Sequence, residues 1–449
     1  MQVLDPLDPQ VQQLVASTHQ RFERLMREAE AKAKPLYRRL FGREASIEEI
    51  IDQIFADVSR EGDAAVVRYA QLFDGATMTP EQLVVGPEAM ARAWATMPKA
   101  LQEAMTQAIA QVTAYQRQLM PRGFGTDLDL PLGVRWTPLA RVGAYNPGGD
   151  SGILPLFSTV IMNLVPAKVA GVAQTVLVTP PRRDGSVAPE ILAAAHAVGV
   201  DEIWTIGGVV AIAAMACGTP RLRAVDKIVG PGNIYVTLAK RRAYGRVDID
   251  MLAGPSEILV IADRSIPPAQ VAADLLSQAE HDVLSMAVCL ALDGAGPAVI
   301  AELQSQVVLL PAARRSTAEE SLKRFGMVVA CDRAQAISLA NQIAPEHLEL
   351  LVADPKPWVA ELRNAGAIFI GPWSPEAIGD YVAGPSHTLP TGGTARMWSG
   401  IAVDTFLRRT SLINLDRATF ERLARSGISL ARGEGLEGHA RSIESRLTP

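Results

Sequence analysis

Two polar residues, Gln278 and His281, stand three positions apart in the segment Ser277–His281 of an expected helix. Side chains at positions i and i+3 of a helix share one face. An amide oxygen and an imidazole nitrogen on that face could bind one divalent metal ion, and histidine suits zinc in particular. The pair is a weak signal by itself, because the same spacing is also typical of a polar helix face.

A second pair, Glu346 and His347, stands in the run Ala344-Pro345-Glu346-His347-Leu348, between an expected helix and an apolar strand. Adjacent carboxylate and imidazole groups can act on one substrate as bases of different pKa. The alternative is a polar pair at the start of a strand. This pair is a sharper catalytic candidate than the helical one.

The segment Gly379–Gly393 is rich in Gly and Pro, yet it contains Asp380 and His387. Long loops of this composition are often functional. A carboxylate and a histidine also occur together in the tail, in the run Glu434–His439.

Glycine turns are candidates for contact with a nucleotide. No GxGxxG motif follows an expected strand. The chain instead has Gly207-Gly208, and it has Gly230-Pro231-Gly232-Asn233 between an expected strand and an expected helix. A glycine turn that opens a helix can closely approach a phosphate or a ribose.

The composition is that of an ordinary globular enzyme. The 449 residues are 48% hydrophobic and 20% charged. The net charge is −5, and the sequence contains no long run of Lys and Arg residues. Nucleic acid and anionic membrane surfaces are therefore poor partners. We expect no signal peptide and no membrane span. The three cysteines are scattered, which favours a reducing, cytoplasmic location.

The elements that position these groups alternate between strand and helix from about residue 135. The predicted strands are 175–179, 202–206, 227–229, 257–262, 286–292, 327–330, 348–352 and 367–370. The predicted helices are 99–118, 189–198, 211–216, 234–242, 269–281, 298–308, 334–343 and 358–364. The run Ser46–Glu49 is a capping box that opens an earlier helix. From about Thr405 the pattern is helical again.

This alternation predicts an α/β fold with two Rossmann-like parallel-sheet domains, joined near Gly254-Pro255. We expect a helical N-terminal segment (1–40) and a first Rossmann-like domain that is discontinuous (41–144 plus 256–400) and holds the metal and catalytic residues. A second Rossmann-like domain (145–255) would bind NAD. A small helical C-terminal tail (401–449) would pack across a dimer.

Taken together, the ordered motifs resemble the histidinol dehydrogenase family, from about residue 40 to the end. The resemblance is carried by the following segments: Val142–Gly149, Gly230–Asn233, Asp250–Glu257, Asp274–His281, Pro345–His347, Gly379–Gly393 and Glu434–His439.

The resemblance implies oxidation of L-histidinol to L-histidine through histidinal, a four-electron reaction that uses two NAD and completes histidine biosynthesis. It implies one zinc ion per subunit, bound by Gln278, His281 and Asp380, with His439 reaching in from the partner subunit of a homodimer. The metal would mainly orient the amine and the imidazole of the substrate.

The resemblance also assigns roles to other residues. His347 would take the alcohol proton, and Glu346 would activate water for the second oxidation. Tyr145 and Asn233 would contact NAD. The residues implied to contact the substrate are Ser256, Gln278, His281, His347, Asp380, His387, Glu434 and His439.

The chain departs from the family pattern at two places. Val210 stands where the family usually has Gln, and Asp282-Val283-Leu284-Ser285-Met286 replaces Asp-Pro-x-Ala-Gln. These changes keep open a zinc and NAD dehydrogenase of the same fold that oxidises another small polar alcohol, such as a sulfonated diol. A zinc hydrolase without NAD and a non-catalytic small-molecule binder are further alternatives.

Overall fold

The computed structural model describes residues 2–17, 21–148 and 155–447. Contacts within the chain divide it into two compact units. The main unit comprises Met1–Leu119 and Ala140–Phe406, and the C-terminal unit comprises Met120–Leu139 and Leu407–Pro449.

The strands are β1 (Val3–Leu4), β2 (Val84–Val85), β3 (Leu132–Pro138), β4 (Arg141–Tyr145), β5 (Gln174–Thr179), β6 (Glu202–Thr205), β7 (Lys227–Val229), β8 (Asp248–Ile249), β9 (Glu257–Ala262), β10 (Met286–Ala291), β11 (Gly326–Ala330), β12 (His347–Leu351), β13 (Ala367–Ile370) and β14 (Leu407–Ile413). The helices are α1 (Pro9–Ser17), α2 (Arg21–Phe41), α3 (Ile47–Glu61), α4 (Asp63–Asp74), α5 (Pro87–Thr96), α6 (Lys99–Gln118), α7 (Ser158–Ala170), α8 (Pro189–Val198), α9 (Gly208–Cys217), α10 (Ile234–Ala243), α11 (Pro268–Ala279), α12 (Gly296–Val307), α13 (Ala312–Phe325), α14 (Arg333–Ile343), α15 (Glu376–Tyr381), α16 (Arg417–Gly433) and α17 (Glu437–Glu444).

Two sheets form the main unit. The first sheet has the order β1-β11-β10-β9-β12-β13, and all of its pairings are parallel. The second has the order β2-β6-β5-β4-β7-β8 and is parallel except for β2. Strands such as β9 and β10 are buried at every position, as expected for parallel strands covered on both faces. The predicted α/β fold with two parallel sheets is confirmed.

Apolar helix faces cover the first sheet on both sides. One face packs against α1 and α14 through residues such as Leu14 and Leu339. The other packs against α11, α12 and α13 through residues such as Leu275 and Val299. The N-terminal segment is helical as predicted, and it also adds β1 to the edge of this sheet.

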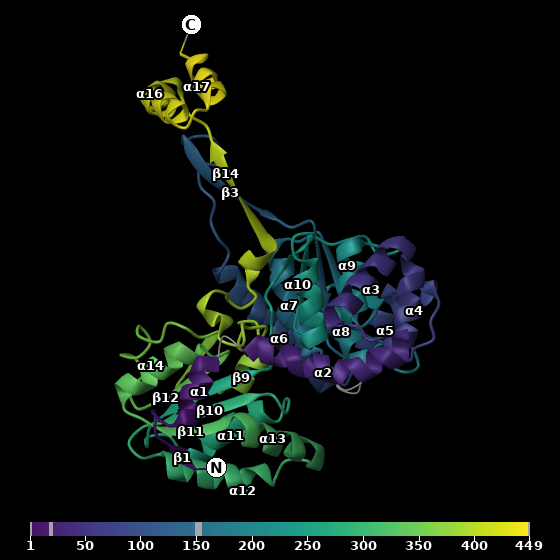
Figure 1. Ribbon diagram of the computed structural model, residues 1–449, viewed down its shortest axis with the longest axis vertical. Coiled ribbons are helices and arrows are strands. Elements are labelled where there is room, and N and C mark those ends of the chain that lie inside the picture. The colour runs from purple at the N-terminus through teal and green to yellow at the C-terminus, as the bar shows by residue number, and fades with distance from the viewer. Residues whose placement is uncertain (1, 18–20, 149–154, 448–449) are drawn as a thin grey trace. The chain divides into compact units, whose positions relative to one another are not determined.

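Residues 41–144, which we expected in the first domain, belong elsewhere: residues 41–119 pack against the second sheet, residues 120–139 are part of the C-terminal unit, and β4 is a strand of the second sheet. The capping box of Ser46 forms and opens α3, whose residues Ile47, Ile50 and Ile54 are buried in one cluster with Trp204. Helices α3 and α4 contact α9, and α5 contacts α8. Figure 1 shows α3, α4 and α5 grouped with α8 and α9. The apolar stripe of α3 is therefore part of the core of the second sheet.

Two of the predicted elements were wrong. Residues 358–364 form turns rather than a helix, because the side chain of Asn341 accepts hydrogen bonds from the backbone N–H groups of Arg363 and Asn364. The tail after Thr405 does not begin as a helix: β14 comes first and pairs antiparallel with β3, from Leu407↔Pro138 to Ile413↔Leu132. The C-terminal unit is thus a two-stranded ribbon with α16 and α17, which pack on each other (Figure 1).

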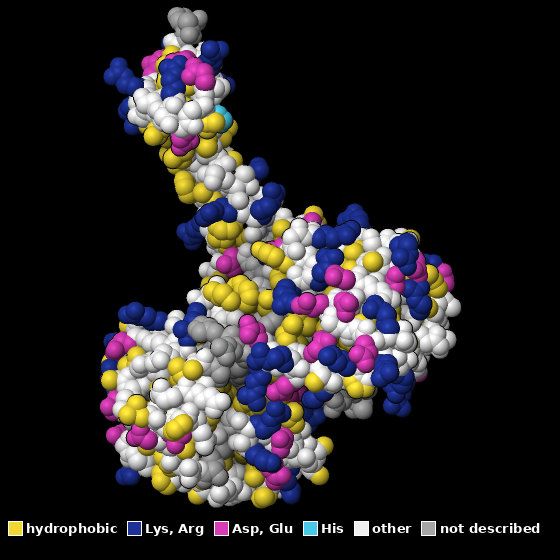
Figure 2. Space-filling model, in the orientation of Figure 1, with side chains coloured by type: hydrophobic (Ala, Val, Ile, Leu, Met, Phe, Trp, Pro, Cys, Tyr) yellow, Lys and Arg dark blue, Asp and Glu magenta, His cyan; other side chains and the backbone are white. Residues whose placement is uncertain are grey.

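Among the described residues, no helix combines the length and the apolar character that crossing a membrane requires. In the face drawn in Figure 2, basic and acidic side chains are interspersed over the main unit, as suits a net charge of −5.

Candidate active site

The strand ends of the two sheets offer two groups of polar residues. Glu257 and His347 begin β9 and β12, so they lie at the amino edge of the first sheet. Tyr145 ends β4 and Gly230 follows β7, so they lie at the carboxyl edge of the second.

The segment Gly379–Gly393, which we expected as one loop, begins in the last turn of α15 and continues as a loop that connects these two groups. Thr388 Oγ1 donates to Asn163 Oδ1 of α7 at 2.8 Å, which attaches the loop to the second sheet's side. The Gly392 N–H donates to Glu257 Oε1 at 3.0 Å, and the Gly254 N–H donates to Thr391 Oγ1. The loop therefore holds the edges of both sheets together.

The surroundings of His347 suit it to act as a base. It is 3% exposed, and its Nδ1 lies 2.9 Å from the carbonyl oxygen of Glu257, which can only accept. Nδ1 therefore carries the proton, and Nε2 keeps its lone pair. Nε2 has no hydrogen-bond partner among the described residues and lies 3.9 Å from Glu376 Oε1. Burial lowers the pKa of His347, which keeps the ring neutral.

Glu346 is buried beside His347. The turn that delivers both residues begins at Ala344, which ends α14 in the left-handed conformation with φ of 49°. Glu346 Oε2 accepts the N–H of Glu257 at 2.9 Å and lies 3.8 Å from His347 Nδ1. Burial, followed by the charges of Glu257 and Asp380, raises the pKa of Glu346 well above its usual value. A carboxylate in such a place is a stronger base than an exposed one.

Metal-type ligands converge next to this pair. One ligand atom each from His347, Glu376 and Asp380 lies within 4.8 Å of the others. Burial, then the charge of Glu376, raises the pKa of Asp380 to about 9. A cation placed among these groups would remove the repulsion between the two carboxylates.

Gln278 supplies a further pair of donor atoms. Its side chain is fully buried near the end of α11, and neither amide atom has a hydrogen-bond partner among the described residues. The neighbouring Ser277 Oγ lies 3.1 Å from Glu376 Oε2, which ties α11 to α15. Buried amides are almost always hydrogen-bonded, so an orphaned one suggests a missing ligand.

Three other expected site residues, His281, His387 and Ser256, lie in the main unit, and two more lie in the C-terminal unit. His281 follows α11 and is exposed, and after burial its proximity contributes to the lowered pKa values of His347 and His387. His387 Nδ1 lies 3.1 Å from the carbonyl oxygen of Asp380. Ser256 directly precedes β9, and its side chain is partly buried.

Glu434 and His439 are exposed residues of the C-terminal unit, at the end of α16 and in α17. Of the remaining histidines, His19 lies outside the described residues, as does Gly149 of the Val142–Gly149 motif. His196 is exposed on α8 beside Trp94.

Sequence reasoning missed Glu376, Glu349 and Asp274. Glu349 Oε1 accepts the N–H of Glu376 at 2.6 Å at the start of α15. Burial raises the pKa of Glu349 well above its usual value and that of Asp274 to about 6. The spacing of Glu376 and Asp380, four residues apart on one helix, could have indicated the first of them.

The expected nucleotide residues lie at the carboxyl edge of the second sheet. Tyr145 is buried, and its hydroxyl accepts the N–H of Gly208 at 3.2 Å; burial raises its pKa to about 12. Asn233 is exposed and caps α10, since its Oδ1 accepts from the N–H groups of Tyr235 and Val236. Val210 is 2% exposed within the apolar core, so its side chain serves packing.

The second departure, Asp282–Met286, forms the turn from α11 to β10. Asp282 Oδ1 accepts the N–H of Leu284 at 2.8 Å, and Met286 is the first residue of β10. The change therefore sits in a closed turn beside His281.

Comparisons with known proteins agree on one family. A family model described as histidinol dehydrogenase matches residues 38–447. A histidinol dehydrogenase of Synechococcus sp. is 48% identical over 409 residues, covering 90% of this chain and 92% of the relative. One from Moorella thermoacetica is 49% identical over 421 residues, covering 92% and 98%. The crystal structure of histidinol dehydrogenase from Elizabethkingia anophelis matches with a TM-score of 0.85 at 34% identity, covering 90% and 93%.

Proposed function

The chain belongs to the histidinol dehydrogenase family, and on that premise we propose that it is the zinc-dependent enzyme that oxidises L-histidinol to L-histidine with two NAD. Membership makes it an oxidoreductase. The metal, the coenzyme and the four-electron course are our proposal.

The observation that carries the proposal is the orphaned amide of Gln278, together with the cluster of His347, Glu376 and Asp380. An amide oxygen, imidazole nitrogens and a carboxylate form a donor set that suits zinc. We infer that Gln278, His281 and Asp380 hold zinc and that His439 of the partner subunit completes its ligands. When bound, zinc would hold the amine and imidazole of histidinol, and NAD would accept the hydrides.

His347 performs the first proton transfer in this proposal. Its Nδ1–H is committed to the carbonyl of Glu257, so only Nε2 can accept the proton of the substrate alcohol. With NAD bound to accept the hydride, Nε2 of His347 would take the alcohol proton as histidinal forms. The depressed pKa of His347 keeps this nitrogen available at neutral pH.

Glu346 acts in the second oxidation. Its carboxylate takes a proton from water, and the resulting hydroxide adds to the aldehyde carbon. With a second NAD bound to accept a hydride, this adduct would become the carboxylic acid, whose proton is released to solvent to give the carboxylate of histidine. The N–H of Glu257 holds one oxygen of Glu346 in place during both steps. Ser256, His387 and Glu434 are the residues we assign to substrate binding besides the metal ligands and His347.

The coenzyme is assigned to the carboxyl edge of the second sheet, beside Tyr145 and Asn233. Parallel α/β sheets bind ligands at that edge, and the N-termini of α9 and α10 begin there. Since the loop 379–393 joins this edge to that of His347, a nicotinamide bound here would be near the substrate.

The experiment is an NADH absorbance assay on purified, zinc-loaded protein. We expect two NADH for each L-histidinol consumed, and none with sulfonated diols. Turnover of another alcohol without turnover of histidinol would replace the substrate, and hydrolysis without NAD would indicate a zinc hydrolase.

The proposed dimer is tested separately. The C-terminal unit exposes Leu430 and Leu436, apolar side chains of the kind a subunit interface covers. A mixture of His439→Ala and His281→Ala chains should regain partial activity, because one of the two sites in a heterodimer keeps all its ligands. No recovery in confirmed heterodimers would contradict a shared site.

A further inference from the structure

A buried ion pair lies beneath the glycine turn of the second sheet. The side chains of Lys240 on α10 and Asp250 after β8 are 3% and 1% exposed, and their charged groups contact each other directly. Few lysines are buried to this degree in proteins unless they are paired.

Both charges also hold the backbone of one residue of the turn. Lys240 Nζ donates to the carbonyl oxygen of Gly230 at 2.9 Å, and the N–H of Gly230 donates to Asp250 Oδ2 at 2.7 Å. Asp250 Oδ1 accepts the N–H of Met251 at 2.6 Å, which fixes the carboxylate itself. Gly230 is thus bound through its N–H and its carbonyl group by two opposite charges.

The backbone conformation at Gly230 requires glycine. Its φ is +110°, and a Cβ atom there would collide with the carbonyl oxygen of Tyr145. Three residues later, Asn233 opens α10 as its N-cap. Movement of the Gly230 peptide would therefore displace the whole turn, from the end of β7 to the start of α10.

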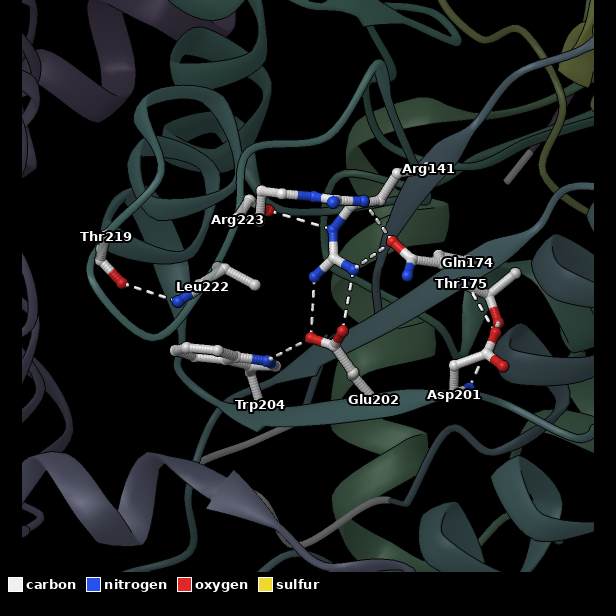
Figure 3. Close-up of polar contacts among 9 residues, drawn as sticks. All are labelled: Arg141, Gln174, Thr175, Asp201, Glu202, Trp204, Thr219, Leu222 and Arg223. Atoms are coloured by element: carbon white, nitrogen blue, oxygen red, sulfur yellow. Dashed lines mark hydrogen bonds and ion pairs between the residues drawn. The ribbon is translucent and has the colours of Figure 1, made fainter.

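The same sheet contains a second, partly buried ion pair at the opposite edge, in which the side chains of Arg141 and Glu202 are 4% and 34% exposed. Arg141, the first residue of β4, is 4% exposed and binds Glu202, the first residue of β6, through two hydrogen bonds of 2.8 and 2.7 Å. Figure 3 shows this pair with Trp204 and Arg223, which bond to its two members. It joins strands together and lies away from the glycine turn, so it offers a matched comparison.

Stability alone does not explain a buried lysine–aspartate pair. Replacing a buried ion pair by neutral side chains of similar size is often close to neutral for stability, whereas removing one partner is costly. The specific effect of Lys240 and Asp250 is on the orientation of the two peptide groups that flank Gly230. A displacement of about 1 Å in a binding group can cost about 100-fold in function.

We propose that Lys240 and Asp250 are positioning residues for the dinucleotide: they hold the Gly230–Asn233 turn where the coenzyme's phosphate or ribose is bound. This inference rests on the proposed NAD-dependent function. Neither residue acts on the reacting atoms.

The test uses the double variant Lys240→Met/Asp250→Asn, which leaves no unpaired buried charge. We expect the Kd for NAD⁺, measured by calorimetry on the zinc-loaded protein, to rise about 10- to 100-fold. The KM for NAD⁺ should rise with it, while kcat at saturating NAD⁺ stays within about twofold of the parent. Amide hydrogen exchange in a peptide spanning 229–236 should become faster in the absence of NAD⁺.

The control is Arg141→Met/Glu202→Gln, which neutralises the other pair. It should leave the Kd for NAD⁺ within about twofold even where it lowers the melting temperature, since positioning is local to the turn. If the Lys240/Asp250 variant binds NAD⁺ as the parent does, or if both double variants weaken it equally, the inference is wrong. If the parent protein itself binds no NAD⁺, the proposed function fails as well.

Discussion

Replacing His347 by asparagine would separate its two hydrogen-bonding functions. The asparagine Nδ2 can occupy the place of the imidazole Nδ1 and donate to the carbonyl oxygen of Glu257, so the anchoring hydrogen bond is kept. Nothing in asparagine replaces Nε2, the nitrogen that has no protein partner among the described residues. The substitution therefore removes the base with little change to its support.

The expected loss follows from that single missing group. A positioned general base contributes about 10²- to 10⁴-fold to the rate, so kcat should fall by that factor, or by roughly 3 to 5 kcal/mol of activation free energy. The parent should also show an acid limb in kcat/KM below the usual histidine pKa of 6.5, because burial lowers the pKa of His347. That limb should disappear in the variant.

The assay is NADH formation from L-histidinol across pH, with zinc content measured for each protein. His196→Asn is the matched control, since His196 is exposed on α8 and should leave kcat and its pH profile unchanged. A His347→Asn protein that keeps its zinc and more than about a tenth of the parent's kcat would refute the assignment of His347 as the base.

Three further outcomes are expected. Gln278→Met should lower the affinity for zinc at least about tenfold in chelator competition. It should also raise the free energy of unfolding of the metal-free protein by about 1 to 3 kcal/mol in urea, because an orphaned buried amide is removed. Unchanged zinc affinity would exclude Gln278 as a ligand. Gly230→Ala should lower the free energy of unfolding by at least about 2 kcal/mol, since φ at this residue is +110° and the added methyl group collides with the Tyr145 carbonyl. A melting temperature equal to the parent's would contradict that geometry. Burial lowers the pKa of His387 in the folded protein from 6.5 to about 4, so the unfolded chain binds this proton at a higher pH than the folded chain does. The metal-free protein should therefore lose stability as the pH falls from about 6.5 to about 4. His387→Asn should flatten this dependence of stability on pH, and a dependence equal to the parent's would exclude His387 as its source.

The sequence predicted most strands of the two sheets, because a strand buried on both faces is a continuous apolar run, but it missed β1, β2, β4 and β8. The runs Glu257–Ala262 and Ala367–Ile370 have the predicted bounds, and the neighbouring strands differ by only a few residues. Continuous apolar runs of this length bounded by turns are typical of parallel strands. The motif residues of the site were also visible, since Glu346 and His347 are polar residues at the start of such a run.

Elements such as β14 and α13 were not predicted, because what stabilises them lies far along the chain. The strand Leu407–Ile413 reads Leu-Arg-Arg-Thr-Ser-Leu-Ile, without regular alternation of polar and apolar residues. It is fixed by pairing with Leu132–Pro138, which no local pattern reveals. Helix α13 buries only Ala318 and Ser321 among its described residues, so its apolar stripe is too narrow to detect. An amphipathic helix such as α3 shows that it has a face to bury without showing which sheet will cover it.

The opposite strand edges used by the two sheets have an electrostatic consequence. Helices α11 and α14 end beside Gln278 and Glu346, so the negative ends of their macrodipoles point toward the cluster at the first sheet's amino edge. Helices α9 and α10 begin at the second sheet's carboxyl edge, where their N-termini present partial positive charge. The backbone alone thus favours a cation on one side and an anionic pyrophosphate on the other. Each ligand would be guided to its own side before any side chain of the site made contact with it.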